Sequence, residues 1–436
     1  MISKILKNKD LTTRILFVLF AIAIFRAGSH IPVPGVDPVA LASMFEKTSG
    51  TLVEMFNTLS GGSLKRFSIF AVGIMPYISA SIIMQLAGFL VPSIKQLKEE
   101  GSNGRRTINK YTKYLTILLA TAQAFGLINT IAGQSAGANP VIPDSGTLFY
   151  TVAITTLVTG TMFLVWISEK VTKYGIGNGL SLMIYASIAS SIPTAAQELI
   201  TLYKGGEMSS LLVSAIFFII FTGVLFIVFV EKGLRKIPIS YSKRKFESLS
   251  ENSGYLPFKV NMANVIPAIF ASSIILFPAT IATWVGNSTD IPLLSEITKN
   301  LTPGNNLYII LYGLLIMFFA FFYVGLLYNP KDISENLGRQ GAFISGFRPG
   351  EQTSLYLKGV INRLTFIGAT YMTIICLIPE LFIKFWQIPF YLGGTSLLII
   401  VVVAMDLDNQ IKSKLSNEEY KSSENLLNKA FSRKIK

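Results

Sequence analysis

The stretch LLVSAIFFIIFTGVLFIVFV, residues 211–230, contains no charged side chain. A helix of roughly 20 apolar residues is long enough to cross the hydrocarbon core of a bilayer. Hydropathy predicts nine further helices of this kind on either side of it, so we expect an all-α polytopic membrane protein. The ten predicted spans are 15–33, 68–91, 114–133, 148–167, 180–199, 211–230, 262–285, 307–327, 364–383 and 391–409.

The composition agrees with this class of protein. Of 436 residues, 51% are hydrophobic and only 14% are charged, which leaves few side chains to solvate the surface of a soluble protein of this length. Several spans are nevertheless rich in Ser, Gly and Gln, as in 68–91 and 180–199. Polar groups at membrane depth are tolerated where other helices or a cavity meet them. These spans are therefore expected to line an interior.

The basic residues are distributed unevenly about the predicted spans. The net charge is +14, and 31 of the 38 Lys and Arg residues fall in the segments that share one side with the N-terminus. Because basic residues are retained on the cytoplasmic side, this asymmetry predicts that both termini are cytoplasmic. The same asymmetry explains the positive net charge, so no direct recognition of nucleic acid by this protein is expected. The six segments are 1–14, 95–113, 168–179, 231–261, 329–363 and 410–436.

Five spans lie on each side of the external loop at Lys204-Gly205-Gly206. An odd number of spans per half gives the two halves opposite orientations in the membrane. This count is the one expected of an inverted repeat, in which a passage lies at the interface between the halves. We expect an N-terminal half at 1–200 and a C-terminal half at 201–436, the latter with the large cytoplasmic loops 231–261 and 329–363 and the tail 410–436. The polar segment 56–67 is too short to span and predicts a re-entrant piece.

Motifs for catalysis or ligand binding are missing from the sequence. It contains no phosphate-binding loop and no zinc-protease or nucleophile-elbow motif. One cysteine, Cys376, and one histidine, His30, leave no cluster of soft metal ligands, so no catalytic residue, cofactor or metal is expected. Arg26 is the only clearly intraspan basic residue, and we interpret it as snorkelling outward or pairing in the bundle. The acidic residues close to the predicted spans lie at the ends of those spans: Glu169, Glu198, Glu231, Glu380 and Asp406.

Seven motifs, in the same order, closely resemble those of the SecY (Sec61-alpha) family of protein-conducting channels, and the resemblance covers nearly the whole chain. They are MPYISASIIMQL (75–86), EEGSNGRRTINKYTKY (99–114), YGIGNGLSL (174–182), KVNMANVIPAIFASSIILFPATIA (259–282), NLGRQGAFISGFRPGEQT (336–353), LIPE (377–380) and PFYLGGTSLLIIVVVAMD (389–406).

The resemblance implies ten transmembrane helices in two inverted five-helix halves, a re-entrant plug helix, and a channel that opens sideways to lipid between the second and seventh spans. It implies that unfolded polypeptides cross the bacterial cytoplasmic (inner) membrane and that transmembrane segments leave laterally. The matching pore-ring residues are Ile74, Ile78, Leu180, Ile184, Ile269 and Ile399; the plug residues are Asn57, Leu59, Gly61, Gly62 and Leu64.

The resemblance also implies positions for the gate and for docking. The lateral gate matches Ser79, Ser81, Gln85, Asn264, Ser272 and Ser273, and docking of the ribosome or of a motor ATPase matches Arg348, Lys243, Arg244, Lys245, Arg105 and Arg106. The loop 231–261 lacks the adjacent arginine pair common in relatives, which weakens the docking assignment there. The implied partners are the small membrane subunits SecE and SecG, the SecA motor, the ribosome, signal peptides, nascent chains and the lipid bilayer.

Two simpler interpretations stay open at this point. Ile and Leu on a membrane helix often only pack or face lipid, and basic loops are often only solvated. A secondary transporter of a small solute, also built from inverted repeats, is the alternative function. The chain itself is expected to be a passive channel and not an enzyme, driven by a partner ATPase or the ribosome, because it has no nucleotide site of its own.

Overall fold

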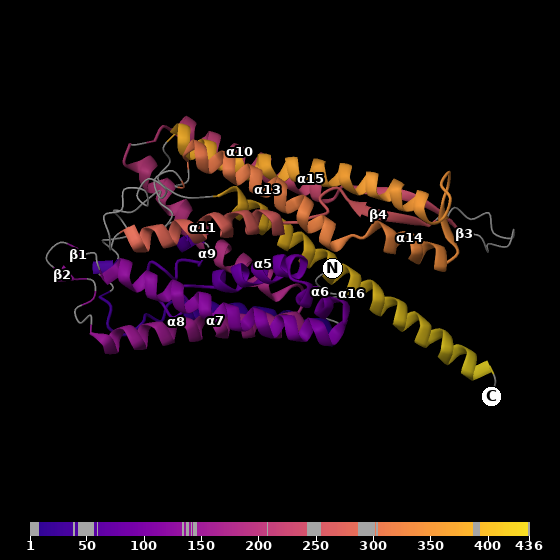
Figure 1. Ribbon diagram of the computed structural model, residues 1–436, viewed down its shortest axis with the longest axis horizontal. Coiled ribbons are helices and arrows are strands. Elements are labelled where there is room, and N and C mark those ends of the chain that lie inside the picture. The colour runs from indigo at the N-terminus through magenta and orange to yellow at the C-terminus, as the bar shows by residue number, and fades with distance from the viewer. Residues whose placement is uncertain are drawn as a thin grey trace. The chain divides into compact units, whose positions relative to one another are not determined.

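The computed structural model describes residues 8–37, 40–41, 56–58, 60–132, 135–136, 139–140, 142, 146–206, 208–241, 254–286, 301, 304–386 and 393–434. The described chain is mostly helical (Figure 1). Its helices are α2 (Lys9–Gly28), α5 (Met75–Leu90), α6 (Pro92–Glu99), α7 (Ser102–Ala132), α8 (Thr147–Tyr174), α9 (Gly179–Lys204), α10 (Ser210–Glu231), α11 (Ile266–Gly286), α13 (Asn306–Leu327), α14 (Pro330–Arg339), α15 (Glu351–Trp386) and α16 (Gly394–Lys434).

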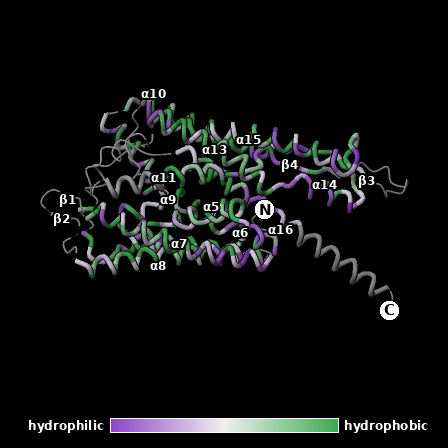
Figure 2. Tube along the Cα trace, in the orientation of Figure 1, coloured by the Kyte–Doolittle hydropathy of each residue, from purple (hydrophilic) through white to green (hydrophobic). Residues whose placement is uncertain are grey.

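Helix α10 carries the stretch that identifies the chain as a membrane protein. The Ser209 side chain accepts a hydrogen bond from the backbone N–H of Leu212 at 3.3 Å and so caps the helix. Only 11% of its most apolar window is buried within the protein, and the helix is hydrophobic along its length (Figure 2). A helix that stays apolar while exposed needs lipid around it. Its bounds agree with the predicted span to within one residue at each end.

Every predicted span has a helix in the described structure. Eight helices are individually long and apolar enough to cross a membrane, and the bent pair α5–α6 makes a ninth. Helix α11 adds a shorter apolar stretch, Ile266–Leu276. The ten-helix membrane fold expected from the sequence is therefore confirmed, with α2, α5, α7 to α11, α13, α15 and α16 at the predicted positions.

The second span begins later than predicted. Hydropathy placed its start at residue 68, but helix α5 begins at Met75, and residues 60–74 form turns. Two backbone features stop the helix from starting earlier. Gly73 has φ of +63°, and Pro76 lies in the first turn of the helix, where its missing N–H costs nothing. The helix then bends by 102° into α6, with Pro92 starting the second piece.

The two long loops 231–261 and 329–363 contain regular structure that hydropathy does not predict. Strands β3 (Leu234–Tyr241) and β4 (Tyr255–Lys259) pair antiparallel, and β5 (Ala342–Ile344) pairs with the other edge of β3. The sheet order is β4-β3-β5, so the loops 231–261 and 329–363 contribute to one sheet. A smaller pair joins β1 (Ser135–Ala136) and β2 (Asn139–Pro140). The predicted tail 410–436 is helical to Lys434, as the continuation of α16.

The chain divides into two compact units. The first contains Met1–Ile200, Thr280–Ile291 and Ile399–Lys436, and the second contains Thr201–Ala279 and Pro292–Leu398. The division near residue 200 lies where the sequence predicts the boundary between the halves, while most of α16 groups with the first unit. Because the last helix crosses between units, we keep the assignment of 1–200 and 201–436 as a prediction.

The first unit is held together by close backbone approaches. A Cβ added to Gly160 of α8 would lie 1.9 Å from the Ile69 carbonyl oxygen, and one added to Gly28 of α2 would lie 2.1 Å from the Phe70 ring. The Phe70 ring stacks between Phe25 and Phe163, with centroids 6.0 and 6.2 Å away. The two glycines therefore let the turn segment 60–74 pack directly on α2 and α8.

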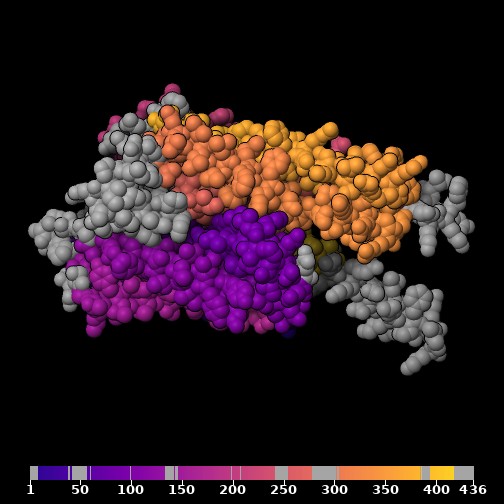
Figure 3. Space-filling model, viewed as in Figure 1, coloured from indigo at the N-terminus to yellow at the C-terminus, as the bar shows by residue number. Residues whose placement is uncertain are grey.

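The second unit packs α13 against α15. Fully buried Tyr308, Tyr312 and Phe319 lie on one side of α13, and α14 packs against α15. Side chains of α13, α14 and α15 form a closely packed surface in the space-filling view (Figure 3). This packing supports the segment after β5 that contains Arg348.

We predict that Gly160→Ala destabilises the folded protein by about 1–3 kcal/mol, the usual cost of an overpacked site, because the new methyl group meets a backbone carbonyl that has little room to move. Gly223→Ala in α10 is the matched control, since a Cβ there meets nothing within 4 Å. Thermal unfolding of both variants in detergent measures the difference. Equal melting temperatures would contradict the proposed packing of α8 on residue 69.

Candidate functional site

The segment 60–74 is non-helical backbone that the sequence places at the edge of the membrane. Its positive φ values fall at Gly61, Gly62, Gly73 and Phe67. The backbone is paired with the residues after α2: Val33 N–H donates to the Phe67 carbonyl at 2.9 Å and Ile69 N–H to the Ile31 carbonyl at 3.0 Å. Irregular backbone persists at membrane depth only when the protein satisfies its polar groups in this way.

The Gly61 carbonyl is the anchor of this segment. It accepts a hydrogen bond from Arg26 Nη1 at 3.3 Å, and the Ser190 hydroxyl of α9, which donates to the Ser187 carbonyl at 2.7 Å, lies 3.4 Å away. A Cβ on Gly61 would lie 3.0 Å from the Ser187 Cα, so the turn rests directly on α9. Arg26 therefore pairs within the bundle, one of the two roles expected of it. The sequence contains the glycines but no signal that their partner is α9.

The structure describes some of the expected plug residues. Residues 56–58 are helical, and the Asn57 side chain accepts from the Lys65 N–H at 2.9 Å, which folds the segment back on itself. Leu64 is buried in the hydrophobic core of the first unit, next to Phe67. Leu59 lies outside the described residues. The predicted re-entrant piece thus ends in a tight turn packed into the protein.

The expected ring residues lie on four helices. Ile74 is the N-cap residue of α5 and Ile78 is one turn further on, and both are buried. On α9, Ile184 is buried and comes one turn before Ser187, where the Gly61 turn rests, while Leu180 is partly exposed. Within the first unit, the segment that contains the Gly61-Gly62 turn thus ends at Ile74, and the turn itself packs on α9 near Leu180 and Ile184. The remaining two are Ile399, buried on α16, and Ile269, partly exposed on α11 of the second unit.

The expected gate residues on α5 form an internal pair. Gln85 Nε2 donates to Ser81 Oγ at 3.1 Å, one turn away, while Gln85 Oε1 is buried without a partner in the described structure. Ser79 is partly exposed on the same helix. An unsatisfied buried amide oxygen is costly, so this part of α5 has unused capacity for hydrogen bonding.

The two expected gate residues on α11 form hydrogen bonds within their own helix. The hydroxyls of Ser272 and Ser273 both donate to the Ile269 carbonyl, at 2.9 and 2.8 Å. Hydroxyls that bond back into their helix bend it slightly and add no polar surface. Asn264 lies in the turn just before α11 with φ of +57°, a conformation that Asn tolerates better than most residues.

Arg348, one of the residues expected to dock a partner, lies on a fixed turn. Its side chain is exposed, while its carbonyl accepts from Thr353 Oγ1 at 2.8 Å, and the Gly350 carbonyl accepts from Ser334 Oγ at 2.7 Å. The rings of Phe347 and Tyr356 stack with centroids 4.2 Å apart. Arg105 and Arg106 are exposed near the start of α7, and Lys243, Arg244 and Lys245 lie outside the described residues.

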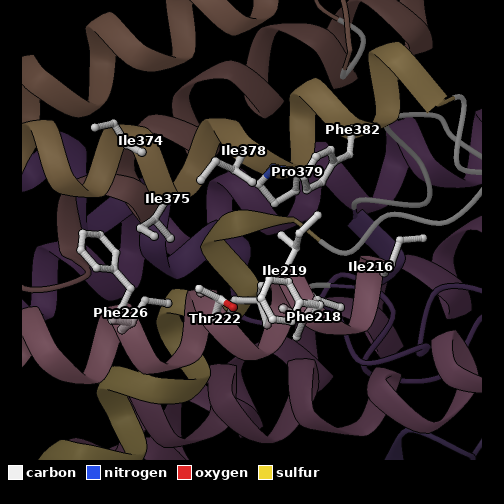
Figure 4. Close-up of a pocket in the computed structure, with 14 residues that line it drawn as sticks. Ile216, Phe218, Ile219, Thr222, Phe226, Ile374, Ile375, Ile378, Pro379 and Phe382 are labelled. Atoms are coloured by element: carbon white, nitrogen blue, oxygen red, sulfur yellow. The ribbon is translucent and has the colours of Figure 1, made fainter. Parts of the chain in front are cut away.

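A cavity of about 290 Å³ lies in the second unit between α10 and α15 (Figure 4). Its lining is apolar except for Thr222: Ile216, Phe218, Ile219, Ile220, Thr222, Gly223, Phe226, Ile227, Ile374, Ile375, Ile378, Pro379, Phe382 and Leu397. A solute site needs several placed polar groups to fix its ligand. This cavity therefore does not support the transporter interpretation.

Sequence reasoning missed one buried pair. Asn261 Nδ2 donates to Glu231 Oε1 at 2.7 Å, and both side chains are buried. Glu231 was visible in the sequence only as an acidic residue at the end of a span. The signal that could have found the pair is its position, because the two residues are the first and last of the loop 231–261.

Comparisons with known proteins agree with the resemblance seen in the sequence. A family model described as SecY matches residues 68–407. Protein translocase subunit SecY of Haemophilus influenzae is 47% identical over 95% of this chain and 93% of its own, and that of Escherichia coli is 47% identical over 95% and 94%.

Solved channels have the same fold. A protein-conducting channel superposes with a TM-score of 0.65 at 18% identity, covering 92% of both chains. A SecY protein, whose plug domain is described as stabilising the closed state of the translocation channel, gives 0.69 at 20% identity with the same coverage. The channel of a canine ribosome-channel complex from the endoplasmic reticulum gives 0.65 at 18% identity, again covering 92% of each.

We predict that Gly61→Ala loosens the turn at residues 60–62 more than Gly62→Ala does. Both glycines have positive φ, so both substitutions carry a similar conformational cost of about 1 kcal/mol. Only at position 61 does the added methyl group also press on α9. In a Cys376→Ala background, the labelling rate of a cysteine introduced at buried Ser60 by a water-soluble maleimide measures the loosening. Equal rates in both variants would contradict the contact with α9.

Proposed function

The chain belongs to the SecY family, and we infer from this membership that it is a protein translocase subunit that forms a protein-conducting channel in a membrane. The observation that carries this inference is 47% identity to curated SecY subunits over 95% of the chain, with no large part of either protein left unmatched. The common fold with solved channels supports it independently. A transporter of small solutes has no comparable support.

We propose the bacterial cytoplasmic membrane as its location, with both termini in the cytoplasm. Two observations support this orientation. The two SecY relatives compared above are bacterial, and 31 of the 38 basic residues belong to segments on the side of the N-terminus. The sheet β4-β3-β5 and Arg348 then face the cytoplasm, where a docking partner would meet them.

The closed channel is proposed to seal through an apolar ring with a plug on its external side. The ring would combine Ile74, Ile78, Leu180, Ile184, Ile269 and Ile399. Large apolar side chains exclude ions by dewetting the constriction, yet they offer no specific hydrogen bonds, so any polypeptide sequence can slide through. The buried glycine turn beside Ile74 and α9 supports a plug at this place, and a solved relative's plug domain is described as maintaining a membrane seal.

The lateral gate is proposed to lie between α5 and α11. Buried polar groups on these two helices, such as Gln85 Oε1, support the assignment, because contacts of this kind are worth only about 0.6 kcal/mol each in membranes and can be exchanged readily. Parting of the two helices would let an apolar segment of a signal peptide or nascent chain leave toward lipid.

The energy for movement is proposed to come from partners. The sequence has no phosphate-binding loop, so a motor ATPase such as SecA or a translating ribosome would drive the chain through the channel. Ribosome-bound channels are among the structural neighbours. SecE and SecG are the small membrane subunits expected to complete the complex.

The ring is tested by ion conductance. We predict that Ile78→Gly combined with Ile184→Gly raises the resting conductance of reconstituted channels severalfold, because water wets a constriction that has lost its apolar lining. Ile83→Gly is the matched control, since Ile83 lies on the same helix but is exposed. Unchanged resting conductance in the double variant would remove these residues from the ring.

The channel function and its coupling are tested by export into vesicles. Unsubstituted protein, reconstituted with SecE, SecG and the motor, should protect an unfolded preprotein from added protease. Arg348→Glu should reduce this export at least tenfold with little loss of folded protein, because an exposed charge on a loop contributes little to stability. Arg348→Lys should be intermediate, since lysine cannot copy the bidentate contacts of arginine.

The matched control for this experiment is Arg339→Glu. Arg339 is an exposed arginine of the same loop, and its ion pair with Glu335 at 3.7 Å is of the exposed kind that contributes little. Its export should remain near normal. Normal export by Arg348→Glu would refute the role of Arg348, whereas absence of export by the unsubstituted protein would refute the channel function itself.

A further inference from the structure

The loop between α10 and α11 closes on itself at its base. The chain leaves α10 at Glu231, runs out along β3 and returns along β4, with Leu234 paired to Lys259. The Val260 N–H then donates to the Gly233 carbonyl at 3.0 Å. The first and last residues of the loop are thereby brought together beneath the sheet.

A buried hydrogen bond fastens this closure. Asn261 Nδ2 donates to Glu231 Oε1 at 2.7 Å, and the exposed fractions of the two side chains are only 1% and 6%. A hydrogen bond to a carboxylate is roughly twice as strong as a neutral one. The same Nδ2 also lies 3.3 Å from the Asn264 carbonyl, so Asn261 joins the end of α10 to the turn that starts α11.

This bond lies in a closely packed region in which some buried polar atoms have no hydrogen-bond partner. A Cβ on Gly368 of α15 would lie 3.2 Å from the Asn261 Cα, so α15 presses against the pair. Within the described residues, buried Asn261 Oδ1 and Tyr371 Oη have no hydrogen-bond partner. Such atoms are rare in native proteins, so both Asn261 and α15 retain unused capacity for hydrogen bonding.

The turn after Asn261 links the pair to α11. Asn264 adopts φ of +57°, a sparsely populated conformation for a residue other than glycine, and α11 begins two residues later at Ile266. Strained backbone of this kind persists only where the surrounding contacts hold it. A change at Asn261 therefore acts on the first turn of α11 with no flexible linker between them.

The sheet connects the same pair to the second cytoplasmic loop. Strand β3 pairs with β4 on one edge and with β5 on the other, from Ile239–Ile344 to Tyr241–Ala342. Arg348 follows β5 after a short turn. One continuous hydrogen-bonded path thus runs from the Arg348 turn through β5, β3 and β4 to Asn261 and α11, all within the second unit.

We propose that the Glu231–Asn261 pair is a positioning device that transmits docking of a motor protein on the cytoplasmic sheet to the gate helix α11. This proposal rests on the proposed channel function and adds a residue-level link to it. Docking shifts the sheet, the sheet shifts Asn261, and Asn261 changes the start of α11. Neither residue needs to contact the motor or the moving polypeptide.

The test separates motor binding from gate response. In a Cys376→Ala background, cysteines at Ser79 and Ser273 report gate closure by their disulfide yield, with and without motor, nucleotide and preprotein. In the reconstituted complex we expect the motor to reduce this yield. Asn261→Leu should weaken the motor's effect about tenfold, the change expected for loss of a hydrogen bond to a charged group. The motor's affinity for the channel should stay within about twofold.

Two further variants complete the test. Glu231→Gln keeps the size of the side chain and its accepting oxygen but removes the charge, so the motor's effect on the disulfide yield should fall by a smaller factor than in Asn261→Leu. If Asn261→Leu does not fold, the result with Glu231→Gln tests the proposal in its place. Thr365→Val is the control for loss of a buried polar group in the same unit, since the Thr365 hydroxyl bonds only to its own helix at Ile361. Its response should be normal.

The opposing outcomes are distinct. A full motor response in both Asn261→Leu and Glu231→Gln would overturn the link. Equal losses of motor affinity and gate response would also overturn it, because the pair would then only support the docking sheet. If the unsubstituted complex itself shows no response to the motor and exports nothing, the failure belongs to the proposed channel function.

Discussion

The structure depends on one constraint: a backbone polar group at membrane depth must find its hydrogen bond inside the protein. Helices meet this constraint alone, and in the described segment 60–74, which is not helical, neighbouring parts of the protein supply partners. The Gly61 carbonyl accepts from Arg26, and the Val33 N–H donates to the Phe67 carbonyl. At Pro379, the missing N–H frees the Ile375 carbonyl, and the start of α16 comes so close that a Cβ on Gly394 would lie 2.3 Å from that oxygen.

The same constraint explains why glycine and polar residues lie in spans that otherwise look poorly suited to lipid. Close approach of backbones requires small residues, as where Gly160 meets the Ile69 carbonyl. Between helices in a membrane there is little hydrophobic driving force, because lipid tails are as apolar as leucine, so packing and hydrogen bonds decide which helices associate. An irregular segment clamped by packing and hydrogen bonds can seal a passage at rest and still be released without unfolding a helix.

Sequence alone predicted the features that come from composition over long windows. The predicted span 211–230 matches α10 to within one residue at each end, because a run of twenty uncharged, mostly apolar residues can be assigned only to a membrane-spanning helix. The start of the second span was misplaced, since hydropathy does not register that Gly73 leaves the helical region. The pairing of β5 with β3 was missed because β5 has only three residues and follows β3 about a hundred residues later along the chain. The Glu231–Asn261 pair was missed because only its position, at the two ends of the loop 231–261, marks it in the sequence.

The loops 231–261 and 329–363 pair in one sheet, which affects how a channel of this kind can be driven. Two loops on separate tethers would each absorb a push by bending. Both loops instead pair with β3, through residues 234–238 on one edge and residues 239–241 on the other, so a displacement of this strand acts on both. Because β4 passes into Asn261 and the turn before α11 within a few residues, the proposed motion would reach α11 through a short segment held by the side-chain hydrogen bonds of Asn261.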